Sequence, residues 1–408
     1  MRWRALSVLA LVIALGAVAC GTGKTSGGGG GGGGGTLRIG AALSLTGSLA
    51  REGLLTKQGY EVCKKVINDK GGVKVGGSSL NLDIAYQDDK SEPDVAAQLV
   101  DRFNDDGVKL ILGPYGSAST EAASAVVERN GQVMADSAGA DDKIFDKGYK
   151  RTFAVLSPAT KYAASIVQAV AELARPKPKT VAILTADDGF SKTAAEGGTA
   201  EAKRQGMQVV AVESFPAHAT DVSAALTKIR AKKPDLIIGS VHLEEGIAII
   251  KQSRELGVAP SGGFGETVAP PTPTFRQTLG KSAEGVLGSS QWVPQVTGQD
   301  KWFGTAKDYV ATYKQQYGQE PEYHNAEATA ACLALALAVE KAGSTQPDKV
   351  RDAMASLDVP SFFGPIKFDS TGKNVTKPMA VIQIQNGKVV TVWPKDAQEA
   401  PLRWPTAA

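Results

Sequence analysis

The sequence contains no apolar run that is long and uninterrupted enough to span a bilayer, which needs roughly 20 apolar residues. The run at residues 5–19 is too short, and the run at 326–339 predicts a buried helix instead. Blocks of like charge are also absent, since the formal net charge is +3 and the lysines and arginines are spread along the chain. We therefore expect no nucleic-acid partner.

The motifs of cofactor and metal chemistry are missing as well. No G-x-G-x-x-G follows a predicted strand, no cysteine pair has C-x-x-C spacing, and no His, Asp and Glu cluster has metal-ligand spacing. The pairs 88–89, 141–142 and 187–188 are aspartates at predicted strand ends or turns, where such residues commonly form turns and caps. We expect neither a cofactor nor a metal ion.

The first 35 residues predict export. Arg2 and Arg4 precede the apolar run at 5–19, and small residues lead to Cys20, a pattern typical of a secretory signal. The residues before Cys20 resemble a bacterial lipobox, which implies that Cys20 is lipidated after removal of residues 1–20. The glycine-rich segment 21–35 then forms a tether. We expect an extracytoplasmic lipoprotein anchored to the bacterial cell membrane.

The other two cysteines, Cys63 and Cys332, lie in helical, apolar patterns. This setting favours buried free thiols. A disulfide between them stays open as the alternative, because an exported protein meets an oxidising environment.

Beyond residue 35, strand-like and helix-like stretches alternate. Continuous apolar strands between amphipathic helices are typical of parallel sheets that are covered on both faces. Two such runs predict an α/β fold with two doubly wound lobes. The C-terminal region differs, because residues 379–384 and 389–393 predict two short strands joined at the hairpin turn Asn386–Gly387.

Several segments resemble type I periplasmic binding proteins, in the branched-chain amino acid and amide receptor subgroup of ABC importers. The matching segments are GAALSLTG (40–47), NDKGG (68–72), LILGPYGSAST (110–120), TDVSAALTKIRAKKPDLIIG (220–239) and SFFGPIKFD (361–369). The resemblance implies two lobes joined by three crossovers near 153–157, 286–290 and 365–368. Lobe one would comprise 36–155 with 290–365, and lobe two 156–289 with 366–405. A ligand would bind between them and be trapped by hinge closure.

In lobe one the resemblance implies ligand contacts from two loops. Ser117 matches the position that holds the ligand carboxylate, at the start of a helix whose free amide groups suit an anion. Ser137, Ala138 and Gly139 match the second contact loop. Glycine stands at 139 where amino-acid receptors usually carry a threonine, which removes one polar contact.

In lobe two the matched Glu266 would bind the ligand ammonium. Val241 stands where amino-acid receptors often have a tyrosine, and the adjacent His242 is a further candidate for the cleft. Three more candidates come from both lobes. Tyr115 and Phe190 would form an apolar wall, and Glu52 would lie in the first cleft loop.

We therefore predict a non-enzymatic, monomeric binding protein that delivers a small amino acid, amide or carboxylate to an ABC permease. A sensor of the same fold is the first alternative. The second is a surface hydrolase using Ser137, because residues 135–139 (ADSAG) imitate a G-x-S-x-G elbow. The hydrolase would need a base from His218, His242 or His324. Neither the ligand nor the permease follows from the sequence.

Overall fold

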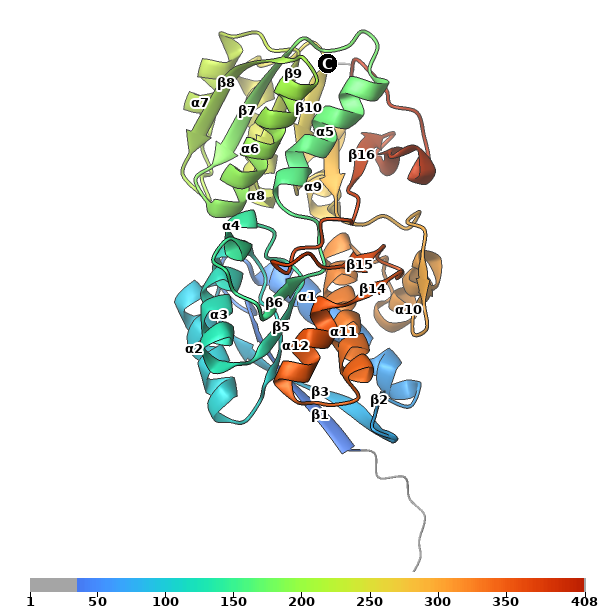
Figure 1. Cartoon of the computed structure of the whole chain (residues 1–408). Coiled ribbons are helices and arrows are strands. Elements are labelled where there is room, and N and C mark those ends of the chain that lie inside the picture. The colour runs from blue at the N-terminus through green and yellow to red at the C-terminus, as the bar shows by residue number, and fades with distance from the viewer. Residues whose placement is uncertain (1–34, 407–408) are drawn as a thin grey trace, which may run out of the picture. The chain divides into compact units, whose positions relative to one another are not determined.

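The computed structural model describes residues 35–406, and these contain two large sheets, each with helices on both faces, and two small two-stranded sheets (Figure 1). The predicted signal peptide, Cys20 and the tether up to residue 34 lie outside the described residues. Gly35, the last residue of the predicted tether, begins strand β1. No helix among the described residues is long and apolar enough to cross a membrane.

The first sheet has six strands in the order β2-β3-β1-β4-β5-β6, and all pairs are parallel except β2 with β3. Its strands are β1 (Gly35–Leu43), β2 (Val73–Val75), β3 (Ser78–Asp88), β4 (Leu110–Leu112), β5 (Val133–Asp136) and β6 (Thr152–Ala154). The central strand β4 is buried throughout, as expected for a parallel strand covered on both faces.

Helices cover both faces of the first sheet. One core layer joins the sheet to α2 (Pro93–Asp105) and α3 (Ser117–Asn130). The opposite layer joins it to helices from both ends of the chain, which are α1 (Ala50–Asp69), α10 (Ala306–Tyr317), α11 (Tyr323–Ala342) and α12 (Pro347–Ala355). The predicted buried helix at 326–339 is confirmed as the centre of α11.

The second sheet has seven strands in the order β17-β16-β11-β10-β9-β7-β8. Its strands are β7 (Thr180–Ala186), β8 (Gln208–Phe215), β9 (Leu236–Ser240), β10 (Gly263–Glu266), β11 (Leu287–Ser290), β16 (Ala380–Gln385) and β17 (Lys388–Trp393). The pairs from β8 to β11 are parallel, and β16 and β17 add antiparallel strands at one edge. The predicted hairpin turn is confirmed, with positive φ at both Asn386 and Gly387.

One face of the second sheet packs against α5 (Thr160–Leu173) and α6 (Gly189–Arg204). The other packs against α7 (Ser223–Arg230), α8 (Leu243–Glu255) and α9 (Pro273–Leu279). Shorter elements are α4 (Asp142–Phe145), β12 (Gln299–Asp300), β13 (Gly304–Thr305), β14 (Asp358–Val359), β15 (Ile366–Lys367), η1 (Gly280–Ala283) and η2 (Lys395–Ala397). The predicted fold of two doubly wound α/β lobes is confirmed.

Three connections join the two sheets, and hydrogen bonds tie them together. Gln291, after β11, accepts from the Ser157 amide and donates to its carbonyl at 2.9 Å each. The Ser157 hydroxyl donates to the carbonyl of Lys377 in the third connection. We expected that connection at 365–368, but β15 pairs with β14, Lys373 forms a bridge to Ala154 of the first sheet, and the chain enters the second sheet only at β16.

The cysteine pair differs from the favoured expectation. Cys63 of α1 and Cys332 of α11 form a disulfide across a Cα–Cα distance of 6.2 Å. Both helices lie on the same face of the first sheet, and Gly59 lets them approach closely, because a Cβ there would lie 2.4 Å from the Asn325 carbonyl oxygen. The two thiols are buried as predicted, but they are not free.

Candidate functional site

A cavity of about 250 Å³, which we call the outer chamber, lies between the lobes. Loops and helix starts of both lobes line it. Its lining residues are Ser48, Leu49, Ser91, Pro93, Tyr115, Gly116, Ser117, Ala118, Ser119, Glu121 and Asp141 from lobe one, and Asp188, Gly189, Phe190, His218 and His242 from lobe two.

A smaller cavity of about 20 Å³, the inner chamber, lies next to it, and the two share five lining residues from Tyr115 to His242. Its lining residues are Tyr115, Gly116, Ser117, Ala138, Ala140, Leu156, Tyr162, Phe190, His242, Val268, Tyr323, His324 and Glu327. A space of this volume holds about one water-sized group.

Six of the thirteen residues that line the inner chamber carry aromatic rings, counting two histidines. Phe190 contacts Tyr162 edge-on with ring centroids 5.0 Å apart, and its other neighbour is His242 at 5.1 Å. From the first lobe, Tyr323 stacks on His324 at 4.0 Å, and Tyr115 lies 5.7 Å from the same imidazole. The wall therefore suits an apolar or aromatic group between the lobes.

Helices α3, α6 and α8 are among those that begin at the outer chamber. Helix α3 begins at Ser117 after Gly116, which caps it with φ 87° and without a side-chain hydrogen bond. Across the chamber, α6 begins after Asp188 and α8 begins after His242. The first amide groups of a helix lack intrahelical partners, and the helix dipole adds partial positive charge there. The chamber is therefore suited to a negatively charged group.

The imidazole of His242 also lies at the outer chamber, beside the Asp188 carboxylate. Its Nε2 lies 3.7 Å from an Asp188 carboxylate oxygen, and its side chain is 26% exposed. Burial lowers the pKa of His242, but the Asp188 carboxylate outweighs burial and raises that pKa to about 9. His242 is therefore protonated at neutral pH.

The acidic groups at the outer chamber already have partners. Asp188 caps α6 by accepting from the Ser191 amide at 2.9 Å. Asp141 caps α4 by accepting from the Lys143 amide, and it also accepts from the Thr193 hydroxyl at 2.7 Å. The capping role predicted for these aspartates is confirmed.

Five of the nine candidate residues meet at the chambers. They are Tyr115, Ser117, Ala138, Phe190 and His242. The Ser117 hydroxyl accepts from the Asp141 amide at 3.1 Å, so its own proton is available for another acceptor.

Ser137 and Gly139, the other two candidates from the loop at 137–139, do not line either chamber. Ser137 is buried, and its hydroxyl lies 2.9 Å from that of Tyr60, which donates to the Gly113 carbonyl. The Gly139 amide donates to Asp136 at 2.9 Å, and a Cβ at 139 would lie 2.5 Å from the Thr120 side chain. Thr120 therefore fills the space that a threonine at 139 would need.

Glu266 and Glu52 do not line either chamber. Glu266 is buried at the end of β10, and a Cβ at Gly246 of α8 would lie 2.5 Å from its Oε2. This side chain points into the second lobe between β10 and α8, and neither carboxylate oxygen has a hydrogen-bond partner among the described residues, so its ammonium contact stays a prediction. Glu52 instead pairs with Arg51 at 3.0 Å, near the start of α1.

Val241, the second departure from the amino-acid receptors, is buried in the core of the second lobe. Its amide donates to the Thr267 hydroxyl, which in turn donates to the Val241 carbonyl. The side chain at 241 therefore does not line the chambers.

Sequence reasoning missed four polar or aromatic residues of the inner wall. Tyr162 lies in the first turn of α5, and Tyr323, His324 and Glu327 lie in the first turns of α11. Glu327 gave a signal, since it is the single acid in the apolar run at 326–339. Among residues 35–406, no three His, Cys, Asp or Glu side chains are grouped to hold a metal.

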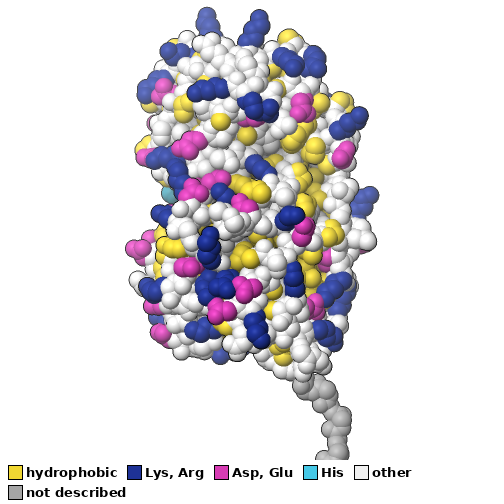
Figure 2. Space-filling view, viewed as in Figure 1, with side chains coloured by type: hydrophobic (Ala, Val, Ile, Leu, Met, Phe, Trp, Pro, Cys, Tyr) yellow, Lys and Arg dark blue, Asp and Glu magenta, His cyan; other side chains and the backbone are white. Residues whose placement is uncertain are grey.

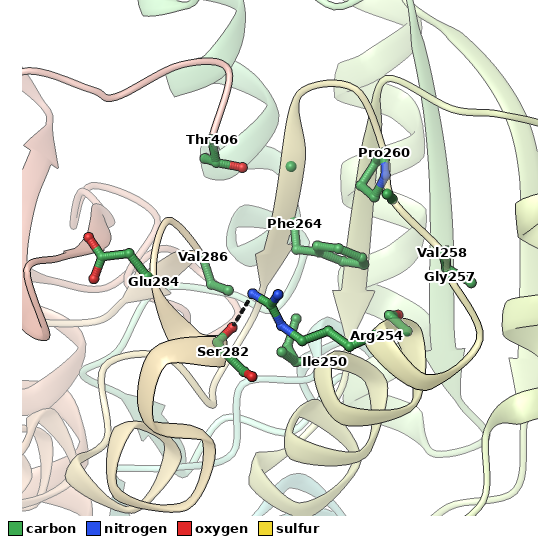
Figure 3. A pocket seen from close by; sticks show the side chains of 13 residues that line it. Ile250, Arg254, Gly257, Val258, Pro260, Phe264, Ser282, Glu284, Val286 and Thr406 are labelled. Carbon is green, nitrogen blue, oxygen red and sulfur yellow. Dashed lines mark hydrogen bonds between the residues drawn. The ribbon is translucent and has the colours of Figure 1, made fainter. Parts of the chain in front are cut away.

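Another cavity, of about 240 Å³, lies within the second lobe between α8, β10 and the C-terminal segment (Figure 3). Its guanidinium, from Arg254, donates to the Ser282 carbonyl at 3.2 Å. None of the nine candidate residues lines it, and only one lobe contributes to it. The two chambers between the lobes are therefore the stronger candidate site.

Comparisons with known proteins agree with this geometry. A protein-family model described as periplasmic binding protein matches residues 36–388 of this chain. Leu/Ile/Val-binding protein homolog 8 of Brucella suis is 25% identical over 98% of this chain and 99% of its own.

Solved structures share the fold. The branched-chain amino acid substrate-binding protein LivJ of Streptococcus pneumoniae, in complex with isoleucine, is 25% identical with a TM-score of 0.75, and the match covers 87% of this chain and 97% of LivJ. A solute-binding protein of R. palustris, in complex with benzoate, is 18% identical with a TM-score of 0.72, over 88% of this chain and 96% of its own.

Proposed function

Because the chain belongs to the periplasmic binding protein family, we propose that it binds a small solute with a carboxylate group between its lobes and delivers it to an ABC permease. The observation that supports a carboxylate group in the solute is the set of hydrogen-bond donors at the outer chamber. The amide groups at the start of α3, the Ser117 hydroxyl and the His242 imidazolium converge there, while Asp141 and Asp188 already have protein partners.

The rest of the solute is apolar or aromatic in this proposal. Tyr115 and Phe190 line the outer chamber as well as the inner one, and burial of an apolar group against their rings is favourable. The isoleucine bound by LivJ and the benzoate bound by the R. palustris protein both combine a carboxylate with an apolar body. These relatives support an amino acid or an organic acid as the solute class.

Solute binding would act by shifting a population of lobe arrangements. A solute that contacts both lobes binds the closed arrangement more tightly than the open one, and it stabilises the closed form by that difference in affinity. The bodies that move would be 36–155 with 290–373, and 156–289 with 380–405. We propose that the permease recognises the closed form.

No bond of the solute would be broken. The Ser137 hydroxyl has a tyrosine hydroxyl as its partner, whereas a serine nucleophile needs a general base such as histidine. This contact argues against the hydrolase alternative and supports a binding role without catalysis.

We also propose that the protein is a monomeric lipoprotein on the outer face of the cell membrane, attached through Cys20. Fractionation of cells that express the wild type or Cys20→Ser tests this. The wild type should sediment with membranes, and the variant should be released or remain unprocessed. A variant that is processed as the wild type is and still sediments with membranes would contradict lipidation.

A thermal-shift screen tests the proposed solute class. Amino acids, aliphatic and aromatic acids, amides and urea would be compared, and a solute bound by the native state raises the melting temperature by mass action. We expect shifts from carboxylates only. A shift from urea or an uncharged amide alone would contradict the carboxylate site.

The Ser117 hydroxyl gives the sharper test at one residue. Ser117→Ala should weaken binding of the best solute by more than about 1 kcal/mol, because it removes a hydrogen bond to a charged group. Titration calorimetry measures this. Ser223→Ala, at the start of α7 and outside both chambers, is the control that should bind as the wild type does. Equal affinity of Ser117→Ala and wild type would contradict the role of Ser117.

A further inference from the structure

Helix α11 presents two polar side chains to the inner chamber without a protein partner. His324 and Glu327 lie three residues apart, on one face of the helix, and are 1% and 3% exposed. Among the described residues, neither ring nitrogen of His324 has a hydrogen-bond partner, and neither does Glu327 Oε2. Neither side chain has a role in the carboxylate site described above.

Such groups are rare in folded proteins, because leaving a buried polar atom unpaired costs about 1–3 kcal/mol. The neighbouring charged groups do not supply the missing partners. Lys377 donates to the carbonyls of Gln291 and Pro378, and the Glu322 carboxylate is 3.9 Å from His324 Nδ1, beyond hydrogen-bond distance. The missing partner is therefore expected from a bound molecule.

We propose that His324 and Glu327 form a subsite for a protonated primary amine, so that the solute is a zwitterion with its ammonium in the inner chamber. The proposal rests on the proposed function, which places the carboxylate at Ser117 and His242. An ammonium has three donors, and the subsite offers a carboxylate and an imidazole nitrogen as acceptors. The rings of Tyr115 and Tyr323 lie beside this subsite, with centroids 5.7 Å and 4.0 Å from that of His324.

The volume of the inner chamber fits this group. About 20 Å³ holds one group of the size of water, which an ammonium matches and a benzene ring exceeds. In this proposal Glu327, on a helix of lobe one, supplies the carboxylate that binds the amine. The resemblance implied Glu266 for that role, and its side chain lies inside lobe two.

Matched pairs of solutes test the subsite. L-leucine and 4-methylpentanoate differ in the amino group, and so do L-phenylalanine and 3-phenylpropanoate. The wild type should bind the amino acid of at least one pair more tightly than its deaminated partner by about tenfold or more. Glu327→Gln should reduce that ratio by about tenfold while the deaminated acid binds as before.

The controls separate this inference from the proposed function. Glu340→Gln, also on α11 but paired with Lys301 outside the chambers, should keep the wild-type ratio. Binding of the deaminated acids with no preference for the amine, or an unchanged ratio in Glu327→Gln, overturns the subsite and leaves the carboxylate site standing. If no carboxylate of any kind binds, the proposed function fails and the subsite with it.

A measurement on the wild type covers the case in which Glu327→Gln does not fold. Burial raises the pKa of Glu327 well above its usual range, although nearby Lys377 opposes this and Asp136 adds to it. This shift favours the protonated carboxyl group in the absence of solute, whereas an arriving ammonium favours the carboxylate, so that binding releases carboxyl protons to the buffer. Calorimetry in two buffers of different ionisation enthalpy should show more proton release for the amino acid than for its deaminated partner, and equal release for the two overturns the subsite.

Discussion

At the scale of single residues, the structure explains both departures from the amino-acid receptors. A threonine at 139 would collide with Thr120, whose side chain fills that space. Val241 is a core residue, so its lack of a hydroxyl removes nothing from the chambers. The proposed amine subsite takes its polar contacts from His324 and Glu327 of α11.

His242 gives a prediction for stability against pH. Its folded-state pKa of about 9 exceeds the ordinary value of 6.5, so protonation of His242 beside Asp188 stabilises the native state. This contribution is complete below pH 6.5 and disappears as the pH rises through 9. Wild type should therefore exceed His242→Gln in free energy of unfolding by about 2 kcal/mol at pH 6 and by almost nothing above pH 9.5.

Urea unfolding of both proteins between pH 6 and pH 9.5 measures that difference. Other groups titrate in this range, but they are common to both proteins and cancel in the difference. Asp188→Asn keeps a side chain able to cap α6, and it should reduce the pH dependence in the same way. A difference that stays constant with pH would show that the ion pair contributes nothing.

At the scale of elements, α11 combines two tasks. Its apolar length forms the centre of the first lobe, and its first turns supply Tyr323, His324 and Glu327 to the inner chamber. The disulfide holds α11 to α1, and Gly59 allows the two helices to approach closely. The position of the proposed amine subsite therefore depends on the packing of this helix pair.

Removal of the disulfide should lower stability. The bond joins residues 269 positions apart, so it restricts the unfolded chain strongly. We expect the double variant Cys63→Ala/Cys332→Ala to lose about 2–5 kcal/mol in free energy of unfolding, measured in urea. Alkylation of the unfolded wild type without reductant should leave both residues unlabelled. Labelling of either cysteine would mean that the thiols are free, as first expected.

At the scale of the whole molecule, the lobes contact each other beside the chambers as well as through the three connections. The Thr193 hydroxyl of α6 donates to Asp141 before α4, and Lys143 lies 3.7 Å from Glu196 of α6. On the face shown in Figure 2, positive and negative side chains are interspersed, in line with the spread of lysines and arginines along the sequence.

Thr193→Val tests whether these contacts support closure. The threonine lines neither chamber, yet its loss should weaken solute binding about fivefold, because the closed form loses a hydrogen bond to a buried carboxylate. Thr227→Val, whose hydroxyl donates within α7, is the matched control and should bind as the wild type does. Equal affinity for all three proteins would show that the Thr193 contact is present in both open and closed forms.

The sequence by itself determined the alternation of strands and helices, the buried α11 and the Asn386–Gly387 hairpin. These follow from local periodicity and from the backbone freedom of particular residues, which neighbours along the chain decide. The order of segments that resemble a known family also led to five of the residues at the chambers, because they follow strand ends in matched loops.

Only the tertiary structure decided the rest. The disulfide joins residues far apart in sequence, the inner wall gathers side chains from residue 115 to residue 327, and Glu266 points into a lobe although it ends a strand near the site. Such outcomes depend on which helix faces meet and on the space that neighbours such as Thr120 already fill. That information lies in packing between distant segments, which no local pattern contains.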